Sequence, residues 1–70
     1  LAYGDGLFET LALREGALRF VDAHLARLAR GCARLAIPMP DEALLREQLA
    51  AVSDGVSHGV AKILLSRGPG

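Results

Sequence analysis

The sequence predicts an α+β fold in which one layer of helices packs on one β-sheet. Three observations support this prediction. A segment near the start alternates along its length as a strand does, two later segments repeat apolar residues at helical spacing, and an apolar run of strand length follows them. The order strand, strand, helix, helix, strand is typical of helices covering one face of a sheet.

The first two strands are predicted to form a hairpin. Along residues 7–13 the odd positions share one face and the even positions the other: Leu7, Glu9, Leu11 and Leu13 against Phe8, Thr10 and Ala12. Residues 14–16 form the turn, with Gly16 placed for a positive φ. Residues 17–20 return as the second strand.

Two helices are predicted next, over residues 22–35 and 42–53. Asp22 is the expected N-cap of the first helix, and Asp41 caps the second after the prolines at 38 and 40 end the first. Gly31 weakens the first helix by about 1 kcal/mol relative to alanine, which indicates close packing there. Glu42 and Arg46 form an i, i+4 pair. The predicted buried positions are Leu25, Leu28, Cys32 and Leu35 in the first helix and Leu45, Leu49 and Val52 in the second.

Residues 60–66 are predicted to form the last strand, after a loop rich in glycine and serine. This strand is apolar on both faces except for Lys62, and such a pattern is typical of a strand at the centre of a sheet.

Composition excludes several classes of protein. Seventy residues allow one small domain, and a hydrophobic content of 51% excludes disorder. Eight basic and eight acidic residues cancel, so net charge gives no reason to expect a nucleic-acid or membrane partner. One cysteine cannot form an internal disulfide, and no apolar run approaches the roughly 20 residues of a membrane span. The chain opens without methionine and ends on Gly70, so we expect a piece of a longer protein.

The chemistry-bearing residues each have an ordinary structural explanation beside a functional one. One side of the first helix carries three arginines, Arg27, Arg30 and Arg34. This side is either a face exposed to solvent or a place where one guanidinium binds a phosphate or a carboxylate. Periodicity does not say which arginine that would be. His24, one turn earlier, is either a packed or capped histidine or a catalyst.

Other candidates give weaker signals. Lys62, the only lysine, either serves as a Schiff-base nucleophile or extends its ammonium to water. Cys32 lies on the apolar stripe and is expected to pack. Two glycines flank Asp5, in a tight turn or close to a ligand, but they match no phosphate-binding glycine fingerprint. No metal site is predicted, because no His, Cys, Asp or Glu cluster has the spacing of metal ligands.

Three motifs together resemble the fold-type IV enzymes that depend on pyridoxal 5'-phosphate. Residues 3–10 (YGDGLFET) resemble the segment that opens their small domain. Residues 24–28 (HLARL), followed by a helix end and Ile-Pro at 37–38, are similar to their next signature. Residues 61–68 (AKILLSRG) resemble the strand that leads into their active-site loop. Residues 1–70 are therefore expected to form part of the N-terminal small domain of such an enzyme.

The resemblance implies roles for particular residues. Arg27 matches the arginine that holds the cofactor phosphate, and His24 belongs to the same motif as its support. Tyr3, Phe8 and Thr10 match positions that line the substrate side of the cofactor.

The resemblance assigns no cofactor role to the remaining cations. Arg30 and Arg34 stay surface residues, and Lys62 does not match the family's Schiff-base lysine. That lysine is expected in a second domain beyond Gly70, so this chain holds no catalytic residue and is expected to be inactive alone.

Within the family, residues 4–10 are most similar to aminodeoxychorismate lyases. This implies conversion of 4-amino-4-deoxychorismate to 4-aminobenzoate and pyruvate in folate biosynthesis, by a cytoplasmic homodimer acting on a small molecule. A branched-chain or D-amino-acid aminotransferase of the same family is the alternative. From another class, the alternative is a non-enzymatic α+β interaction module that uses the arginine side of the helix to bind protein.

Overall fold

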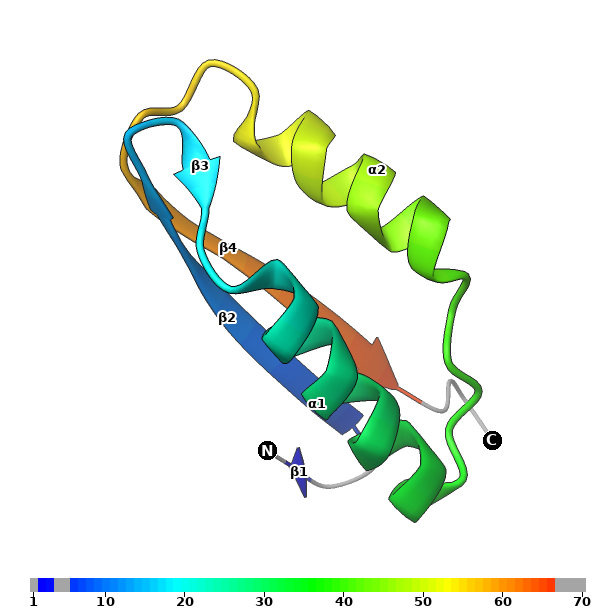
Figure 1. The fold of residues 1–70 in the computed structure, drawn as a ribbon. Helices are drawn as coiled ribbons and strands as arrows, with labels where there is room; N and C mark the ends of the chain where they lie inside the picture. The colour runs from blue at the N-terminus through cyan, green and yellow to red at the C-terminus, as the bar shows by residue number, and fades with distance from the viewer. Residues whose placement is uncertain (1, 4–5, 67–70) are drawn as a thin grey trace.

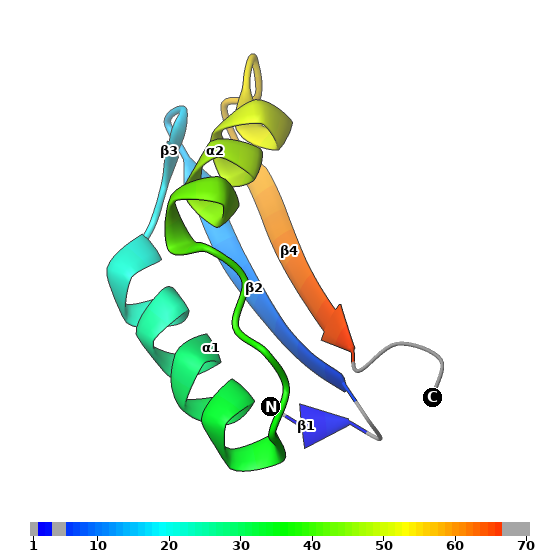
Figure 2. The ribbon, with the colours of Figure 1, turned by 90° about the vertical axis from the view of Figure 1, so that its right-hand side faces the viewer.

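The computed structural model describes residues 2–3 and 6–66. Its elements are, in order, β1 (Ala2–Tyr3), β2 (Gly6–Arg14), β3 (Ala17–Leu18), α1 (Val21–Leu35), α2 (Glu42–Ser53) and β4 (Gly59–Ser66). Both helices lie on the same face of the sheet (Figures 1 and 2). The predicted α+β fold, with one layer of helices on one sheet, is confirmed.

Strand β2 organises the sheet. It pairs antiparallel with β4 along its length, from Gly6 opposite Ser66 to Leu13 opposite Gly59. Strands β1 and β3 pair antiparallel with the two ends of β2. Because β4 pairs with β2 alone in the described part of the chain, the prediction that β4 is a central strand is wrong there.

The hairpin turn forms as its sequence predicts, but the returning strand is short. Glu15 and Gly16 have φ values of 52° and 78°, so both central residues of the turn are left-handed, as a tight two-residue hairpin requires. Strand β3 stops at Leu18 rather than at residue 20. Phe20 adopts φ 56° and directs the chain into α1 instead of continuing the strand.

The core lies between the helices and the inner face of β2. The predicted alternation is confirmed, because the odd positions of β2 are buried and the even positions are not. The buried side chains are Leu7, Glu9, Leu11 and Leu13 of β2, Leu25, Leu28 and Cys32 of α1, Ile37 of the segment between the helices, Leu45 and Leu49 of α2, and Ala61 and Ile63 of β4.

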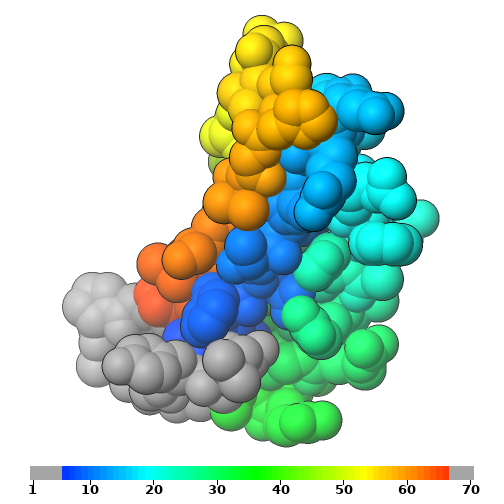
Figure 3. Space-filling view, turned by 90° about the vertical axis from the view of Figure 1, so that its left-hand side faces the viewer, coloured from blue at the N-terminus to red at the C-terminus, as the bar shows by residue number. Residues whose placement is uncertain are grey.

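No helix of the described residues covers the other face of the sheet (Figure 3). Val60 and Leu64 are 71% and 74% exposed on that face. The two faces of β4 are therefore unequal, although the sequence is apolar on both. An apolar run does not distinguish a strand buried on both faces from one that leaves one face open.

One predicted helix cap is confirmed and one is wrong. The Asp41 side chain accepts a hydrogen bond from the Ala43 amide at 3.0 Å and caps α2. Asp22 lies inside α1, because the helix begins at Val21. There its carboxylate lies near the positive end of the helix dipole, which stabilises the negative charge. It also accepts a hydrogen bond from Arg46 of α2 at 2.5 Å. Arg46 also bonds Glu42, so the predicted i, i+4 pair is confirmed.

Val52 is not the buried anchor that helical spacing predicts, since it is 67% exposed. It lines a groove of about 470 Å³ between α2 and β4, together with Leu44, Leu49 and Leu64. Val52 lines the same groove as Leu45 and Leu49, but the described residues leave most of it exposed. No helix in the described ranges has the length and apolar character of a membrane span.

Gly31 lies where α1 approaches β2 closely, as predicted. A Cβ atom at this position would lie 3.1 Å from both Leu7 methyl carbons, closer than carbon atoms normally pack.

Gly31→Val is expected to destabilise the protein by about 1–3 kcal/mol, because the added methyl groups overpack this contact. Ala33→Val, at an exposed position of the same helix, is the matched control. Denaturant unfolding measures both changes, and equal losses for the two variants would contradict the packing argument.

Candidate functional site

Glu9 is the one charged residue in the core of the described chain, and its side chain is 1% exposed. Strand alternation places it on the inner face, between Leu7 and Leu11. Burying a carboxylate without partners costs several kcal/mol, so such a group has to be paired with hydrogen-bond donors.

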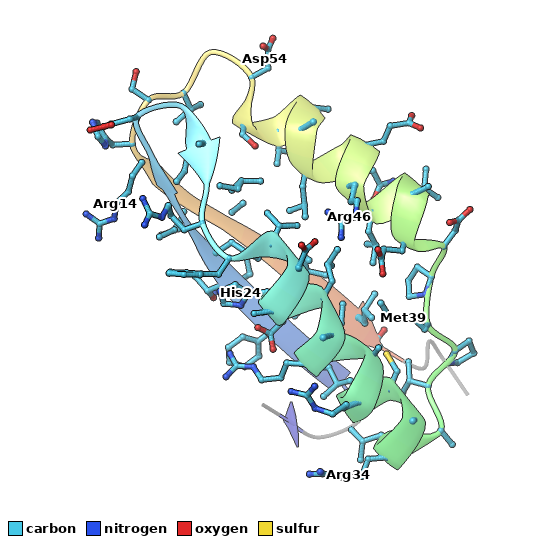
Figure 4. The ribbon with its side chains drawn as sticks, viewed as in Figure 1. Arg14, His24, Arg34, Met39, Arg46 and Asp54 are labelled. Carbon is cyan, nitrogen blue, oxygen red and sulfur yellow. The ribbon has the colours of Figure 1, made fainter. Side chains whose placement is uncertain are left out.

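Three donors from α1 surround the Glu9 carboxylate. Arg27 donates from Nε to Oε2 at 2.9 Å and from Nη2 to Oε1 at 3.0 Å, which forms a two-point fork. His24 Nδ1 lies 2.7 Å from the same Oε1, and it is the donor because an ionised carboxylate only accepts. His24 and Arg27 are three residues apart and therefore face β2 from neighbouring turns of α1. Figure 4 shows His24 beside β2.

These contacts determine the protonation states of Glu9 and Arg27. Burial acts to raise the pKa of Glu9, but the hydrogen bonds from Arg27 and His24, together with their charges, outweigh it and lower that pKa below the usual 4.5. Hydrogen bonding to Glu9 and its negative charge raise the pKa of Arg27. The pair is therefore ionised at neutral pH.

Arg27 still presents donors to solvent. Its side chain is 61% exposed, and two of the five N–H groups of a guanidinium bond Glu9. Among the described residues, Glu9 is its one hydrogen-bond partner, so three of its N–H groups have no partner there. Two hollows of about 330 and 270 Å³ border Arg27, and Arg30 lines both of them. This cluster of positive charge can accept an anion such as a phosphate.

Phe8 and Thr10 lie on the outer face of β2, on either side of Glu9 in the sequence. Phe8 is half-buried and lines the 330 Å³ hollow together with Arg27. Thr10 is exposed and lines a neighbouring hollow together with His24. The prediction that Phe8 and Thr10 share one strand face is confirmed. This face borders the cluster of positive charge formed by Arg27 and Arg30. The third predicted pocket residue, Tyr3, pairs with Gly6 through its backbone, and its side chain lies outside the described part.

The other candidate residues have structural explanations. Lys62 is exposed opposite Thr10, with Nζ 5.7 Å from the centre of the Phe8 ring. Cys32 is 2% exposed, and burial raises the pKa of its thiol, which suits packing. Arg34 lies at the far end of α1 from His24 (Figure 4), and it lines the 330 Å³ hollow together with Arg27 and Arg30. In the described ranges, no three His, Cys, Asp or Glu residues could hold a metal ion together.

A larger hollow lies elsewhere. About 540 Å³ lies between the hairpin turn and the end of α2, and Asp54 is its one ionisable lining residue. We place the candidate site at Arg27 because the cationic donors and the buried acid converge there.

Sequence reasoning missed Glu9 as a site residue. The signal was present, because an acid on a strand face otherwise made of leucines needs a cationic partner. The identity of that partner required knowledge of which turn of α1 packs on β2.

Comparison with known proteins assigns the chain. The family model described as amino-transferase class IV matches residues 6–70. The chain belongs to the class IV aminotransferase family. Members of this family use pyridoxal 5'-phosphate, whose phosphate is the kind of anion that Arg27 could bind.

Three class IV relatives are similar along almost the whole chain. A bifunctional aminodeoxychorismate lyase / D-amino acid transaminase of Mycobacterium tuberculosis is 34% identical over 93% of the chain, and an aminodeoxychorismate lyase of Vibrio harveyi is 38% identical over 97%. The crystal structure of 4-amino-4-deoxychorismate lyase from Pseudomonas aeruginosa superposes with a TM-score of 0.82, at 56% identity over 97% of the chain. The chain spans about a quarter of the length of each, 24% of the first and 25% of the others.

Glu9→Gln tests the buried pair through its pH dependence. Because the folded-state pKa of Glu9 is lowered, its stabilising effect is present above the unfolded pKa and is lost as the pH falls through the folded value. At neutral pH the variant is expected to be about 1–3 kcal/mol less stable than wild type. The gap should narrow as the pH falls through the usual glutamate value of 4.5 and below it, as denaturant unfolding would show. A gap of constant size would contradict the assigned pairing.

Proposed function

We propose that this chain is part of a pyridoxal-phosphate-dependent lyase that converts 4-amino-4-deoxychorismate to 4-aminobenzoate and pyruvate, a step of folate biosynthesis. All three relatives described above carry aminodeoxychorismate lyase in their names, and one of them is 56% identical in this region. These names favour an enzyme over the interaction module considered as the alternative from another class.

The fork between Arg27 and Glu9 is the observation that supports the proposal most directly. An exposed guanidinium that is fixed on its inner side by a buried carboxylate offers its outer N–H groups to a phosphate. The residues present therefore fit the phosphate of the cofactor, with Arg27 as the residue that holds it.

The outer face of β2 forms the proposed substrate side. Phe8 supplies an aromatic surface and Thr10 a hydroxyl group, and both border hollows next to the Arg27 cluster. Tyr3 is assigned to the same side through the family resemblance. When bound, pyridoxal phosphate acts as an electron sink for the reaction. We propose that these side chains orient the substrate toward the cofactor, and that Schiff-base formation belongs to a lysine outside this chain.

A D-amino-acid transaminase is the second candidate. The Mycobacterium tuberculosis relative is named for both activities, so a relative of this chain combines the two reactions in one protein. No relative described above is named as a branched-chain aminotransferase. We also propose, from the family resemblance, that the complete protein is a cytoplasmic homodimer, which light scattering on the purified enzyme would test.

Substrate assays on the full-length enzyme separate the two candidates. With aminodeoxychorismate, we expect release of 4-aminobenzoate and pyruvate. With a D-amino acid and 2-oxoglutarate, we expect a slower reaction or none. Transamination without any lyase activity would contradict the proposed function.

Arg27→Ala in the full-length enzyme is expected to weaken pyridoxal phosphate binding by about 10- to 100-fold, through loss of charge-assisted hydrogen bonds. Some stability is lost as well, because Glu9 keeps only His24 as partner. Arg46→Ala is the matched control, since Arg46 also bonds carboxylates but lies between the helices (Figure 4). Cofactor absorbance measures binding, and equal affinity in the two variants would contradict the role of Arg27.

A further inference from the structure

We propose that Glu9 is a positioning residue, which holds the Arg27 guanidinium in the orientation that receives the cofactor phosphate before the cofactor arrives. This inference rests on the proposed function, because it assigns the phosphate to Arg27. It adds a residue that never touches the cofactor but determines how tightly the cofactor is held.

The geometry of the fork carries the proposal. Two bonds, from Nε to Oε2 and from Nη2 to Oε1, fix the plane of the guanidinium, whereas a single bond would leave it free to rotate. The carboxylate is itself held by its surroundings. It is 1% exposed, it is anchored by His24 at 2.7 Å, and it lies on a strand that is paired with β4 along its length.

This arrangement is unusual for an exposed arginine. A side chain that is 61% exposed normally samples several rotamers, and binding then has to select one of them. Glu9 removes that cost before binding. The rotamer freedom of an arginine corresponds to about a tenfold difference in affinity, or somewhat more.

The charge of Glu9 has the opposite effect, because a carboxylate repels a phosphate nearby. A test therefore has to change the position of the carboxylate and keep its charge. Glu9→Asp does so, since it withdraws the carboxylate from the fork by about 1.5 Å, one carbon–carbon bond.

The experiment measures binding of pyridoxal phosphate and of pyridoxal, which lacks the phosphate, to the full-length apoenzyme. Glu9→Asp is expected to weaken pyridoxal phosphate binding by about tenfold and to leave pyridoxal binding unchanged. In an Arg27→Ala background, Glu9→Asp is expected to have no further effect on either ligand. Glu42→Asp, which shortens the exposed carboxylate partner of Arg46, is the matched control and should change neither affinity.

Three results would overturn the positioning role: unchanged pyridoxal phosphate affinity in Glu9→Asp, equal weakening of both ligands, or equal weakening with and without Arg27. If Arg27→Ala itself leaves pyridoxal phosphate binding unchanged, the proposed phosphate site fails instead. The two failures are therefore distinguishable.

A measurement on the unmutated apoenzyme covers the case in which Glu9→Asp does not fold. Nuclear magnetic resonance relaxation of the arginine Nε–H groups should give Arg27 an order parameter of about 0.85, against less than about 0.6 for the exposed Arg34. Equal mobility of the two side chains before the cofactor is added would overturn the proposal.

Discussion

The need to pair one buried carboxylate governs how the first helix lies on the sheet. Glu9 occupies a position on β2 that leucines hold on both sides, and its oxygens are out of reach of water. Three donors from neighbouring turns of α1 have to converge on it, and they do so only for one rotation of the helix about its axis and one position along the strand. Hydrophobic burial alone would tolerate several such arrangements, because it is not directional. The ion pair selects among them.

The same constraint creates the site. Since Glu9 faces inward, alternation along β2 requires Phe8 and Thr10 to face outward. Since Arg27 reaches inward from α1 to Glu9, its remaining donors lie at the border between the helix layer and the open face of the sheet. A cationic group, an aromatic ring and a hydroxyl therefore meet along one edge of one strand. The resemblance to known enzymes assigned these residues to one site, and the packing explains why they can share it.

How far the sequence predicted the structure depended on how local each interaction was. The alternation of β2, the left-handed turn at Gly16 and the cap at Asp41 follow from neighbouring residues, and they were predicted correctly. The cap expected at Asp22 was wrong, because Phe20 turns the chain into α1 and a distant arginine of α2 takes up that carboxylate.

The errors in β4 and Glu9 have a common origin. An apolar strand looks the same whether one or both of its faces are covered, and a lone acid does not reveal its partner. Both answers depend on which segments pack together, and that is a property of the tertiary structure. For the site, sequence alone proposed Arg27, Phe8 and Thr10 through their resemblance to a family. It could not supply the contact with Glu9, which spans 18 positions in the chain.

The uncovered face of the sheet separates two kinds of evolutionary change. Side chains on the inner face, such as Leu11, are locked into a close-packed interior, where replacements are costly. Side chains on the outer face, such as Phe8 and Thr10, can be exchanged without disturbing that interior. A strand built in this way can change the side chains of its outer face while the scaffold is inherited intact. Such a division suits a family whose named members include both lyases and a transaminase.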